Sequence, residues 1–377
     1  MQTLQVPQGN FPLQRLPIRK KETLFPWDAA DELLLNYVEE QHVLEKDARL
    51  VIVNDQFGAL AVALAEYHPT VMSDSLLAFK AIAQNLENNT VDPKSLTLLP
   101  STEELQVSID VLLIKVPRTL AALEDQLRRL RPQCHDKTRI IAAGMTKNIH
   151  NSTLSLFETI IGTTETSLAK KKARLIFSQW DASLEVSPTP YPTSYPLENT
   201  EYKIINHAGV FSAQSLDIGT RFFLQHIPAS TTAQRIVDLG CGNGVVGLDA
   251  ALKNPQAEII FTDESYQAVA SAEVTFRAAF GDSRQASFIV TDCLQGLDAE
   301  SVDLILVNPP FHQHNALTTH TASQMFREAK QVLKQGGEIR VIGNRHLNYH
   351  LSLKRLYGNY INIASNKKFA ILKAVKR

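Results

Sequence analysis

The stretch "RIVDLGCGNGVVGLDAA", Arg235–Ala251, decides the fold of this chain. An apolar run ends at Leu239, glycines follow at Gly240, Gly242 and Gly244, and an alanine-bearing segment comes next. Glycine tolerates positive φ and lets a ligand approach the backbone closely. A strand, a glycine turn and a helix in this order indicate a doubly wound α/β sheet, in which ligands bind beyond the carboxyl ends of the strands.

Strands and helices alternate through the rest of the second half. Apolar runs predict strands at residues 236–239, 258–262, 287–290, 304–307, 338–342 and 369–373. Helices are expected after Gly244, Ser265 and Thr319. Apolar strands separated by helices indicate a largely parallel sheet that is covered on both faces.

The first half repeats this pattern. "RLVIVNDQFGALAVALA" (Arg49–Ala65) resembles the opening stretch, and "IDVLLIKVP" (Ile109–Pro117) resembles "VDLILVNPP" (Val302–Pro310). Two unrelated α/β domains could share such patterns, but "KKKARLIF" (170–177) and "NKKFAILK" (366–373) also match, including the Lys-Lys pair. We therefore expect an α/β protein with two tandem Rossmann-like domains that arose by internal duplication.

A proline-rich stretch, "SPTPYPTSYP" (Ser187–Pro196), lies between the halves and is typical of a stiff, extended connector. We expect a first domain over residues 1–183, a linker over 184–200 and a second domain over 201–377. The length agrees with this division, because 377 residues exceed what one hydrophobic core usually serves.

Composition narrows the class of protein. The formal net charge is −1, so a nucleic-acid partner would have to be met by a local basic patch. Three scattered cysteines, Cys134, Cys241 and Cys293, indicate neither a disulfide framework nor a zinc site, and we expect no metal. No apolar run approaches the roughly 18 residues of a membrane span, and the N-terminal stretch lacks the apolar core of a signal peptide. We expect a monomeric, cytoplasmic protein with no membrane partner.

The glycine loop suits two classes of cofactor. A G-x-G-x-x-G pattern at Gly242–Gly247 is compatible with a nicotinamide dinucleotide, whose pyrophosphate needs a helix N-terminus. S-adenosylmethionine has no phosphate and carries an ammonium, which the acidic Asp238 at the strand end would suit better. The loop residues that would line its methionine and ribose are Gly240, Gly242, Asn243 and Gly244.

Acidic residues also follow the next two strands. Asp263 lies 19 residues after Gly244, near the spacing of about 20 at which a carboxylate accepts from ribose hydroxyls, and Glu264 adjoins it. Asp292, after the third strand, could accept from the adenine amine. A helix N-cap is the alternative role for Glu264 and Asp292.

The fourth strand ends in Asn308, Pro309, Pro310 and Phe311. A planar amine is a poor nucleophile because its lone pair is delocalised, and two acceptors aimed at its hydrogens would favour attack on a methyl group. The Asn308 side-chain oxygen and the Pro309 carbonyl could be these acceptors, held in advance by the prolines. Phe311 offers a face on which a base can stack. By themselves the four residues could form a Pro-rich strand exit with a buried Phe. Joined to the glycine loop and the two acidic strand ends, they predict methyl transfer to such an amine.

Similarity to one family extends nearly end to end. "NDQFGAL", "LIKVP", "VFS", "LDIG", "NPPFHQ", "NRHLNY" and "NKKFAILKAVK" resemble the ribosomal RNA large subunit methyltransferase G family, which is similar in plan to the small subunit methyltransferase C enzymes. The resemblance implies two methyltransferase-like domains, of which only the second is active, and methylation of guanine N2 in large-subunit (23S) ribosomal RNA. It also implies that Phe211 lies near the substrate and that the Asp217–Thr220 turn, with Thr220 among the cofactor contacts, lies near the methionine end.

The first half departs from the pattern where chemistry needs it. Asn54 to Phe57 replace Gly240 to Asn243, and Lys115, a donor that cannot accept an amine's hydrogens, stands in place of Asn308. We expect this half to bind no cofactor and to serve as scaffold and RNA-docking surface. Candidate RNA contacts are the basic clusters at 19–21 and 170–172, Arg345 with His346, and Lys367 with Lys368.

Three other functions fit parts of the sequence. A protein glutamine N-methyltransferase would meet the same planar amine, but a duplicated docking domain argues against it. A non-catalytic RNA-binding protein would not need the intact Gly240, Asp263 and Asn308. A dehydrogenase would bind a nicotinamide and would leave the Asn308–Phe311 exit without a role.

Overall fold

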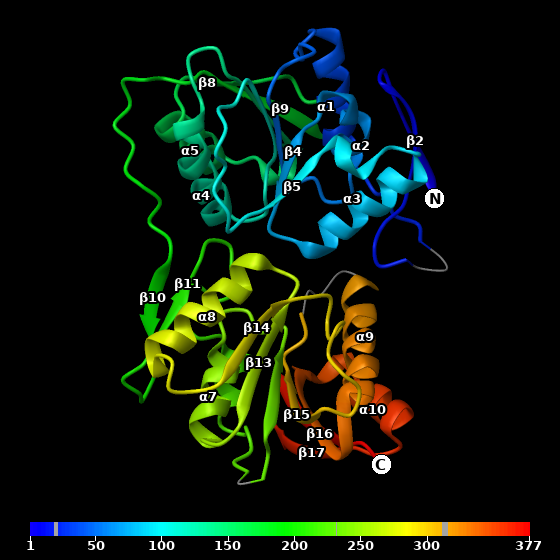
Figure 1. Cartoon of the computed structure of the whole chain (residues 1–377), viewed down its shortest axis with the longest axis vertical. Coiled ribbons are helices and arrows are strands. Elements are labelled where there is room, and N and C mark those ends of the chain that lie inside the picture. Colours follow the sequence, from blue (N-terminus) through cyan, green and yellow to red (C-terminus); the bar gives the residue numbers. More distant parts are fainter. Residues whose placement is uncertain (19–21, 231, 311–315) are drawn as a thin grey trace. The chain divides into compact units, whose positions relative to one another are not determined.

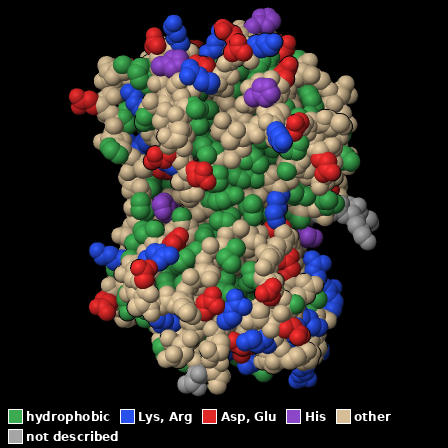
Figure 2. Space-filling model, viewed as in Figure 1, with side chains coloured by type: hydrophobic (Ala, Val, Ile, Leu, Met, Phe, Trp, Pro, Cys, Tyr) green, Lys and Arg blue, Asp and Glu red, His purple; other side chains and the backbone are tan. Residues whose placement is uncertain are grey.

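The structure is a computed structural model that describes residues 1–18, 22–230, 232–310 and 316–377, with the backbone alone described for 316–319 (Figure 1). The chain divides into two compact units, Met1–Tyr191 and Pro192–Arg377. Figure 2 shows acidic and basic side chains mixed over most of the visible face, as the near-zero net charge leads one to expect. Among the helices of the described ranges, none is long and apolar enough to cross a membrane.

The first unit is built on a seven-stranded sheet of order β5-β4-β3-β6-β7-β9-β8. Its five strands from β5 to β7 are parallel, while β9 and β8 are antiparallel to their neighbours. The sheet strands are β3 (Leu50–Val53), β4 (Thr70–Ser73), β5 (Thr97–Pro100), β6 (Val111–Lys115), β7 (Arg139–Met145), β8 (Thr164–Thr166) and β9 (Ala173–Ser178). The helices are α1 (Ala29–Glu40), α2 (Ala59–Ala63), α3 (Leu76–Asn88), α4 (Leu120–Leu130) and α5 (Asn151–Ile160), and β1 (Gln2–Val6) forms a hairpin with β2 (Gly9–Leu13).

The second unit has a sheet of order β14-β13-β12-β15-β16-β18-β17. Its strands are β12 (Arg235–Leu239), β13 (Glu258–Asp263), β14 (Ala286–Val290), β15 (Val302–Val307), β16 (Leu333–Asn344), β17 (Ile361–Ser365) and β18 (Phe369–Val375). The helices are α6 (Ile218–Leu224), α7 (Val245–Lys253), α8 (Tyr266–Phe280), α9 (Ala316–Val332) and α10 (Tyr349–Tyr357), and β10 (Thr193–Pro196) pairs with β11 (Lys203–Asn206).

The two sheets have the same strand order, and individual contacts repeat as well. The Asp110 carboxylate accepts from the Arg49 backbone N–H at 2.9 Å, and the Asp303 carboxylate accepts from the Arg235 N–H at 2.9 Å. Ser75 caps α3 and Ser265 caps α8 in the same way, through their hydroxyls. The predicted fold class, α/β with two tandem Rossmann-like domains, is confirmed.

Three elements of the second unit differ from the expected elements, while the expected domain bounds stay a prediction. The last helix of the parallel region begins at Ala316 instead of after Thr319, and β17 was not predicted because its residues are almost all exposed and show no apolar run. Thr193–Pro196, inside the expected linker, forms β10. Proline is tolerated there because Pro196 lies at the end of a two-stranded ribbon, where a missing donor interrupts no ladder.

The order of the second sheet determines where a ligand can bind. From β12 the chain continues to β13 and β14 on one side and then returns to β15 on the other, so the topology switches beside β12. Such a switch point opens a crevice at the carboxyl edge of the sheet. Strands β14, β13, β12 and β15 are neighbours, and their ends bring Asp292, Asp263, Asp238 and Asn308 to this one edge.

Candidate active site

The glycine loop between β12 and α7 is a tight turn of left-handed residues. Gly240, Gly242 and Gly244 have φ of 73°, 53° and 79°. The Gly240 and Cys241 N–H groups both donate to the Thr262 carbonyl, at 2.8 and 3.0 Å, which fixes the loop against β13. A Cβ built on Gly242 meets nothing within 4 Å. The loop therefore has one open side, from which a ligand can contact the backbone.

Asp263 holds the glycine loop to the end of β13. One carboxylate oxygen accepts from the Gly242 N–H at 3.1 Å and the other from the Ser265 N–H at 3.0 Å. Burial raises the pKa of Asp263, and these backbone hydrogen bonds oppose the rise. Glu264 follows it, half-buried, just before α8. The ribose contact of Asp263 stays a prediction, but the structure adds a second role in shaping the loop.

Asp238 is 2% exposed and connects β12 to the first turn of α7. Its carboxylate accepts from the Gly247 N–H at 2.8 Å. Burial raises the pKa of Asp238 to about 8, against one backbone hydrogen bond that lowers it. The expected contact with a cofactor ammonium stays a prediction, and the contact with Gly247 was not predicted.

The raised pKa of Asp238 predicts a pH dependence of stability. Between about pH 4 and pH 8 the folded state keeps a proton that the unfolded chain releases, so the free energy of unfolding should fall as pH rises, by up to about 1.4 kcal/mol per pH unit. Asp238→Asn retains an acceptor for Gly247 but cannot ionise. Calorimetry of both proteins from pH 5 to 8 should show the variant gaining relative stability as pH increases, and parallel curves would contradict the prediction.

Asn243 anchors the loop to the β10–β11 hairpin. It is 4% exposed, and its Nδ2 donates to Asn206 Oδ1 at 2.9 Å and to the Tyr195 hydroxyl at 3.3 Å. Sequence reasoning placed Asn243 among the cofactor contacts but missed both partners, which lie 37 and 48 residues away. The side chain orients the loop, so any cofactor contact of Asn243 would come from its backbone.

Asp292 follows β14 and contacts α9. Its carboxylate accepts from Gln324 Nε2 at 3.1 Å and from Gln295 Nε2 at 3.3 Å. Gln324 also donates to Glu328 at 2.8 Å. The predicted contact between Asp292 and an adenine amine is untested, and Gln324 is a polar neighbour of that position which the sequence did not indicate.

Asn308 is held by a relay of hydrogen bonds from α6. Its Nδ2 donates to Thr220 Oγ1 at 3.0 Å, while the Thr220 N–H and hydroxyl lie 2.9 and 3.4 Å from Asp217 Oδ2. The Asn308 Oδ1 is buried and has no hydrogen-bond partner in the described part of the chain. A buried acceptor without a partner is costly, and such atoms occur where function requires them. Because Nδ2 is bound to Thr220, Oδ1 is turned away from Thr220 and is available to accept a hydrogen bond from a ligand.

The other residues of the strand exit differ in exposure. Pro309 is buried and Pro310 is exposed, whereas Phe311 lies outside the described residues, as does the basic cluster at 19–21. Phe211, which the resemblance puts near the substrate, is 62% exposed. The described residues contain no group of three or more histidine, cysteine or acidic side chains that could hold a metal.

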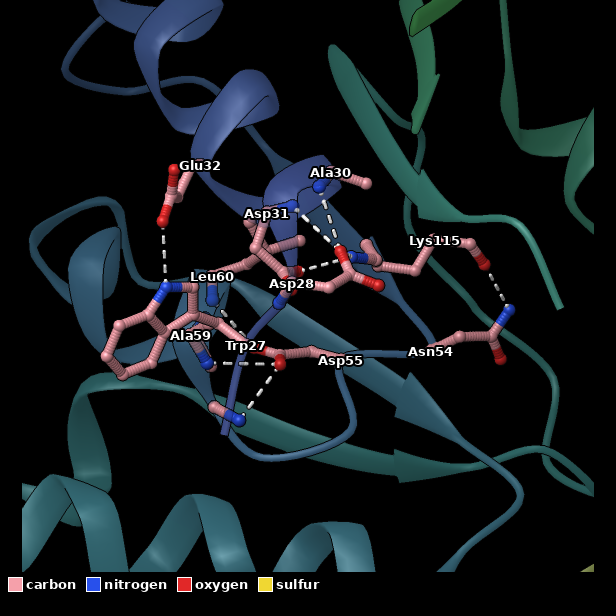
Figure 3. A network of polar contacts seen from close by, with 12 residues as sticks. Trp27, Asp28, Ala30, Asp31, Glu32, Asn54, Asp55, Ala59, Leu60 and Lys115 are labelled. Carbon is pink, nitrogen blue, oxygen red and sulfur yellow. Dashed lines mark hydrogen bonds and ion pairs between the residues drawn. The ribbon is translucent and has the colours of Figure 1, made fainter. Parts of the chain in front are cut away.

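The equivalent edge of the first unit is filled by its own charged side chains (Figure 3). The Lys115 ammonium lies 2.8 Å from Asp28 and 2.7 Å from Asp31, at the start of α1. The buried Asp55 carboxylate accepts from four backbone N–H groups, those of Gly58, Ala59, Leu60 and Ala61, at 2.8–3.1 Å. The strand register equates Lys115 with Asn308, because Val53 pairs with Ile114 as Leu239 pairs with Val307.

Phe57 completes the contrast with the second unit. It occupies the position of Asn243, is 7% exposed, and has the Arg15 guanidinium 4.4 Å from its ring centroid. The glycine loop of the second unit is open beside Gly242. The equivalent loop of the first unit is closed, because the Asp55 carboxylate binds its backbone N–H groups and the stacked side chains of Phe57 and Arg15 cover it.

A dehydrogenase that binds a nicotinamide dinucleotide does not need an amide acceptor fixed at the end of β15. An enzyme that methylates an amine nitrogen does need such an acceptor. The strand order is that of a Rossmann-like sheet, and the family matches of the chain define the class as an S-adenosylmethionine-dependent methyltransferase. The RLMG N-terminal domain family matches residues 1–182, and the methyltransferase small domain family matches residues 201–373. The chain belongs to the ribosomal RNA large subunit methyltransferase G family, which confirms the resemblance.

Curated relatives support this assignment along the whole chain. The ribosomal RNA large subunit methyltransferase G of Streptomyces avermitilis is 50% identical over 98% of this chain and 98% of its own length. The protein of that name from Pseudoalteromonas translucida is 47% identical, over 99% and 98%. Among solved structures, the T. thermophilus 16S rRNA N2 guanine methyltransferase RsmC, in complex with S-adenosylmethionine and guanosine, matches 100% of this chain and 98% of its own with a TM-score of 0.77. At 19% identity this likeness shows a common fold.

Proposed function

We propose that this chain transfers a methyl group from S-adenosylmethionine to the exocyclic N2 of one guanine in large-subunit ribosomal RNA. The observation that carries the proposal is the buried Asn308 Oδ1, which the relay from Thr220 holds without a partner among the described residues. It lies at the sheet edge that the glycine loop opens. The names of the relatives supply the class of RNA and their reaction.

The strand exit would make the amine reactive. Asn308 Oδ1 and the Pro309 carbonyl would each accept one N2 hydrogen, which draws the nitrogen lone pair out of conjugation with the base. Because Pro309 and Pro310 restrict the backbone, and Thr220 fixes the amide, little reorganisation is needed. Phe311 would stack on the base. Bound S-adenosylmethionine would supply an electrophilic methyl group and would leave as S-adenosylhomocysteine. The ammonium formed on N2 would lose its proton to water, and no covalent enzyme intermediate is needed.

The cofactor would lie along the edge from Asp292 to Asn308. We assign the backbone of Gly240, Gly242, Asn243 and Gly244 to its methionine and ribose, Asp263 and Glu264 to the ribose hydroxyls, and Asp292 to the adenine amine. Asp238 and Thr220 would face the methionine end. The open side of Gly242 fits this placement, since a side chain there would occupy the space that the cofactor needs.

The first unit would bind no cofactor. Asp55 and Lys115 already satisfy, within the chain, the donors and charges that an open loop would offer to a ligand. We assign residues 1–183 to a scaffold and RNA-docking domain, 184–200 to the linker and 201–377 to the catalytic domain. The protein would act in the cytoplasm, as a monomer.

This assignment predicts one cofactor site per chain. Isothermal titration of the full chain with S-adenosylmethionine should give one equivalent, and Asp263→Asn should weaken binding roughly 10- to 150-fold, because a charge-assisted hydrogen bond is lost. Asp74→Asn is the matched control, since Asp74 follows β4 as Asp263 ends β13 and accepts from Ser101 at 2.8 Å. Two equivalents, or an equal effect of both variants, would refute the assignment.

A transfer assay tests the function itself. Protein-free large-subunit RNA from cells that lack the gene should accept label from the methyl donor at a single guanine N2. Methylation of a protein glutamine under the same conditions, with no label in RNA, would replace the proposal with the alternative substrate.

A further inference from the structure

The C-terminal segment has an unusual charge distribution. From Ile339 to Arg377 there are nine lysines and arginines and no aspartate or glutamate, whereas the rest of the chain holds 29 basic and 39 acidic residues. Basic side chains gather at the margin of the second unit where α10 and the C-terminus lie (Figures 1 and 2). A chain with a net charge of −1 therefore concentrates positive charge in one segment.

Part of this charge lines a groove of about 1050 Å³ between the end of β16 and the turn from β17 to β18. Arg345, Lys367 and Lys368 are exposed on its walls. The ion pairs recorded for the segment use Arg340, Lys373 and Lys376 instead. Within the described residues, the three groove cations have no carboxylate partner.

The groove also offers aromatic and amide groups. Tyr360 is 39% exposed, and its ring centroid lies 5.6 Å from that of His350. Asn362 and Asn348 are exposed on the lining. A ring that a base can stack on, amides that can bond base edges, and cations for phosphates are the combination that binds single-stranded nucleic acid.

The groove adjoins the elements that hold Asn308. The Arg345 N–H donates to the Lys368 carbonyl at 3.0 Å, which joins its two walls. Phe369 follows Lys368 and packs on α6, where a Cβ at Gly219 would be 3.1 Å from the Phe369 ring. The next residue of α6 is Thr220, the hydrogen-bond partner of Asn308. The groove and the proposed active site therefore share the same edge of the sheet.

We propose that this groove binds a single-stranded segment of the substrate RNA that flanks the target guanine, with phosphates on Arg345, Lys367 and Lys368 and one base stacked on Tyr360. This inference rests on the proposed function and adds a substrate site on the catalytic unit itself. By holding the flanking strand, the groove would raise the affinity of the catalytic unit for its RNA.

Charge reversal of the full chain tests the groove. Lys367→Glu combined with Lys368→Glu should raise the KM for large-subunit RNA at least tenfold and leave kcat and the Kd for S-adenosylmethionine unchanged. The slope of log Kd for RNA against log salt should become smaller by about 1.4, because two phosphate contacts are lost and each contributes about 0.7 on a single strand. Tyr360→Ala should weaken RNA binding roughly 5- to 150-fold with an unchanged salt slope.

The matched control reverses the same charge outside the groove. Lys354→Glu combined with Arg355→Glu changes two exposed residues of α10 that do not line it. RNA affinity close to that of the wild type in this control supports the groove, while equal losses in both double variants, or no loss in either, overturn it. Direct RNA binding does not depend on turnover, so absence of methyl transfer by the wild type would refute the proposed function separately.

Discussion

Replacing Asn308 by alanine is expected to reduce kcat about 10²–10³-fold, with the Kd for S-adenosylmethionine unchanged. The magnitude is that of removing one preorganised polar group that acts in the transition state. Stability should change by no more than about 1 kcal/mol, because the variant loses one hydrogen bond to Thr220 and also removes a buried acceptor that had no described partner. Single-turnover transfer at saturating cofactor and RNA measures the effect.

Thr220 provides the control for this experiment. Thr220→Val leaves the Asn308 side chain in place but removes the acceptor for its Nδ2, so the amide can turn its oxygen away from the substrate. We expect a smaller loss of kcat, roughly three- to tenfold, which corresponds to one neutral hydrogen bond. Thr220→Ser should restore the rate. Equal rates for wild type and Asn308→Ala would remove the basis of the proposed chemistry.

The parts of the site that the sequence predicted are those set by strand order. Each of Asp238, Asp263, Asp292 and Asn308 is at or just beyond the end of an apolar strand, and a doubly wound sheet brings such ends to one edge. The prediction needed only the alternation of apolar strands with helices and the parallel sheet that this alternation indicates. It required no knowledge of which side chains touch.

What the sequence could not give are contacts between residues far apart in the chain. Thr220 and Asn308 are 88 residues apart, and Asn243 and Tyr195 are 48 apart. Polar pairs of this kind have no local signature, because either residue would look ordinary on a surface loop. The groove could not be predicted from the sequence either, because Arg345 and Lys368 come together only when β18 pairs with β16.

The second large effect is expected at Gly244. An alanine Cβ there would lie 2.8 Å from both Cα and Cβ of Ala272 in α8, and φ is +79°, a conformation that alanine adopts at a cost. Positive φ costs about 1–2 kcal/mol and overpacking about 1–3 kcal/mol, so Gly244→Ala should destabilise the second unit by about 2–5 kcal/mol. For a unit of this size the melting temperature should fall by roughly 4–20 °C, measured by calorimetry.

Gly242→Ala is the matched variant, because it should lower cofactor affinity without the packing clash that Gly244→Ala introduces. Its Cβ meets nothing within 4 Å, so only the cost of positive φ applies, about 1–2 kcal/mol, while cofactor affinity should fall because the new methyl group fills the open side of the loop. If Gly242→Ala binds S-adenosylmethionine as the wild type does, the proposed position of the cofactor is wrong.

The first unit retains only one of these two glycines. Gly58, at the position of Gly244, is retained with φ of +88°, and a Cβ there would lie 3.2 Å from the Ile82 backbone in α3. Gln56 replaces Gly242, the glycine whose open side only a ligand would need. A unit that kept the glycine required for helix packing and lost the one required for ligand approach is expected to fold normally and bind no cofactor. Gly58→Ala should therefore lower the stability of the first unit and leave cofactor affinity unchanged.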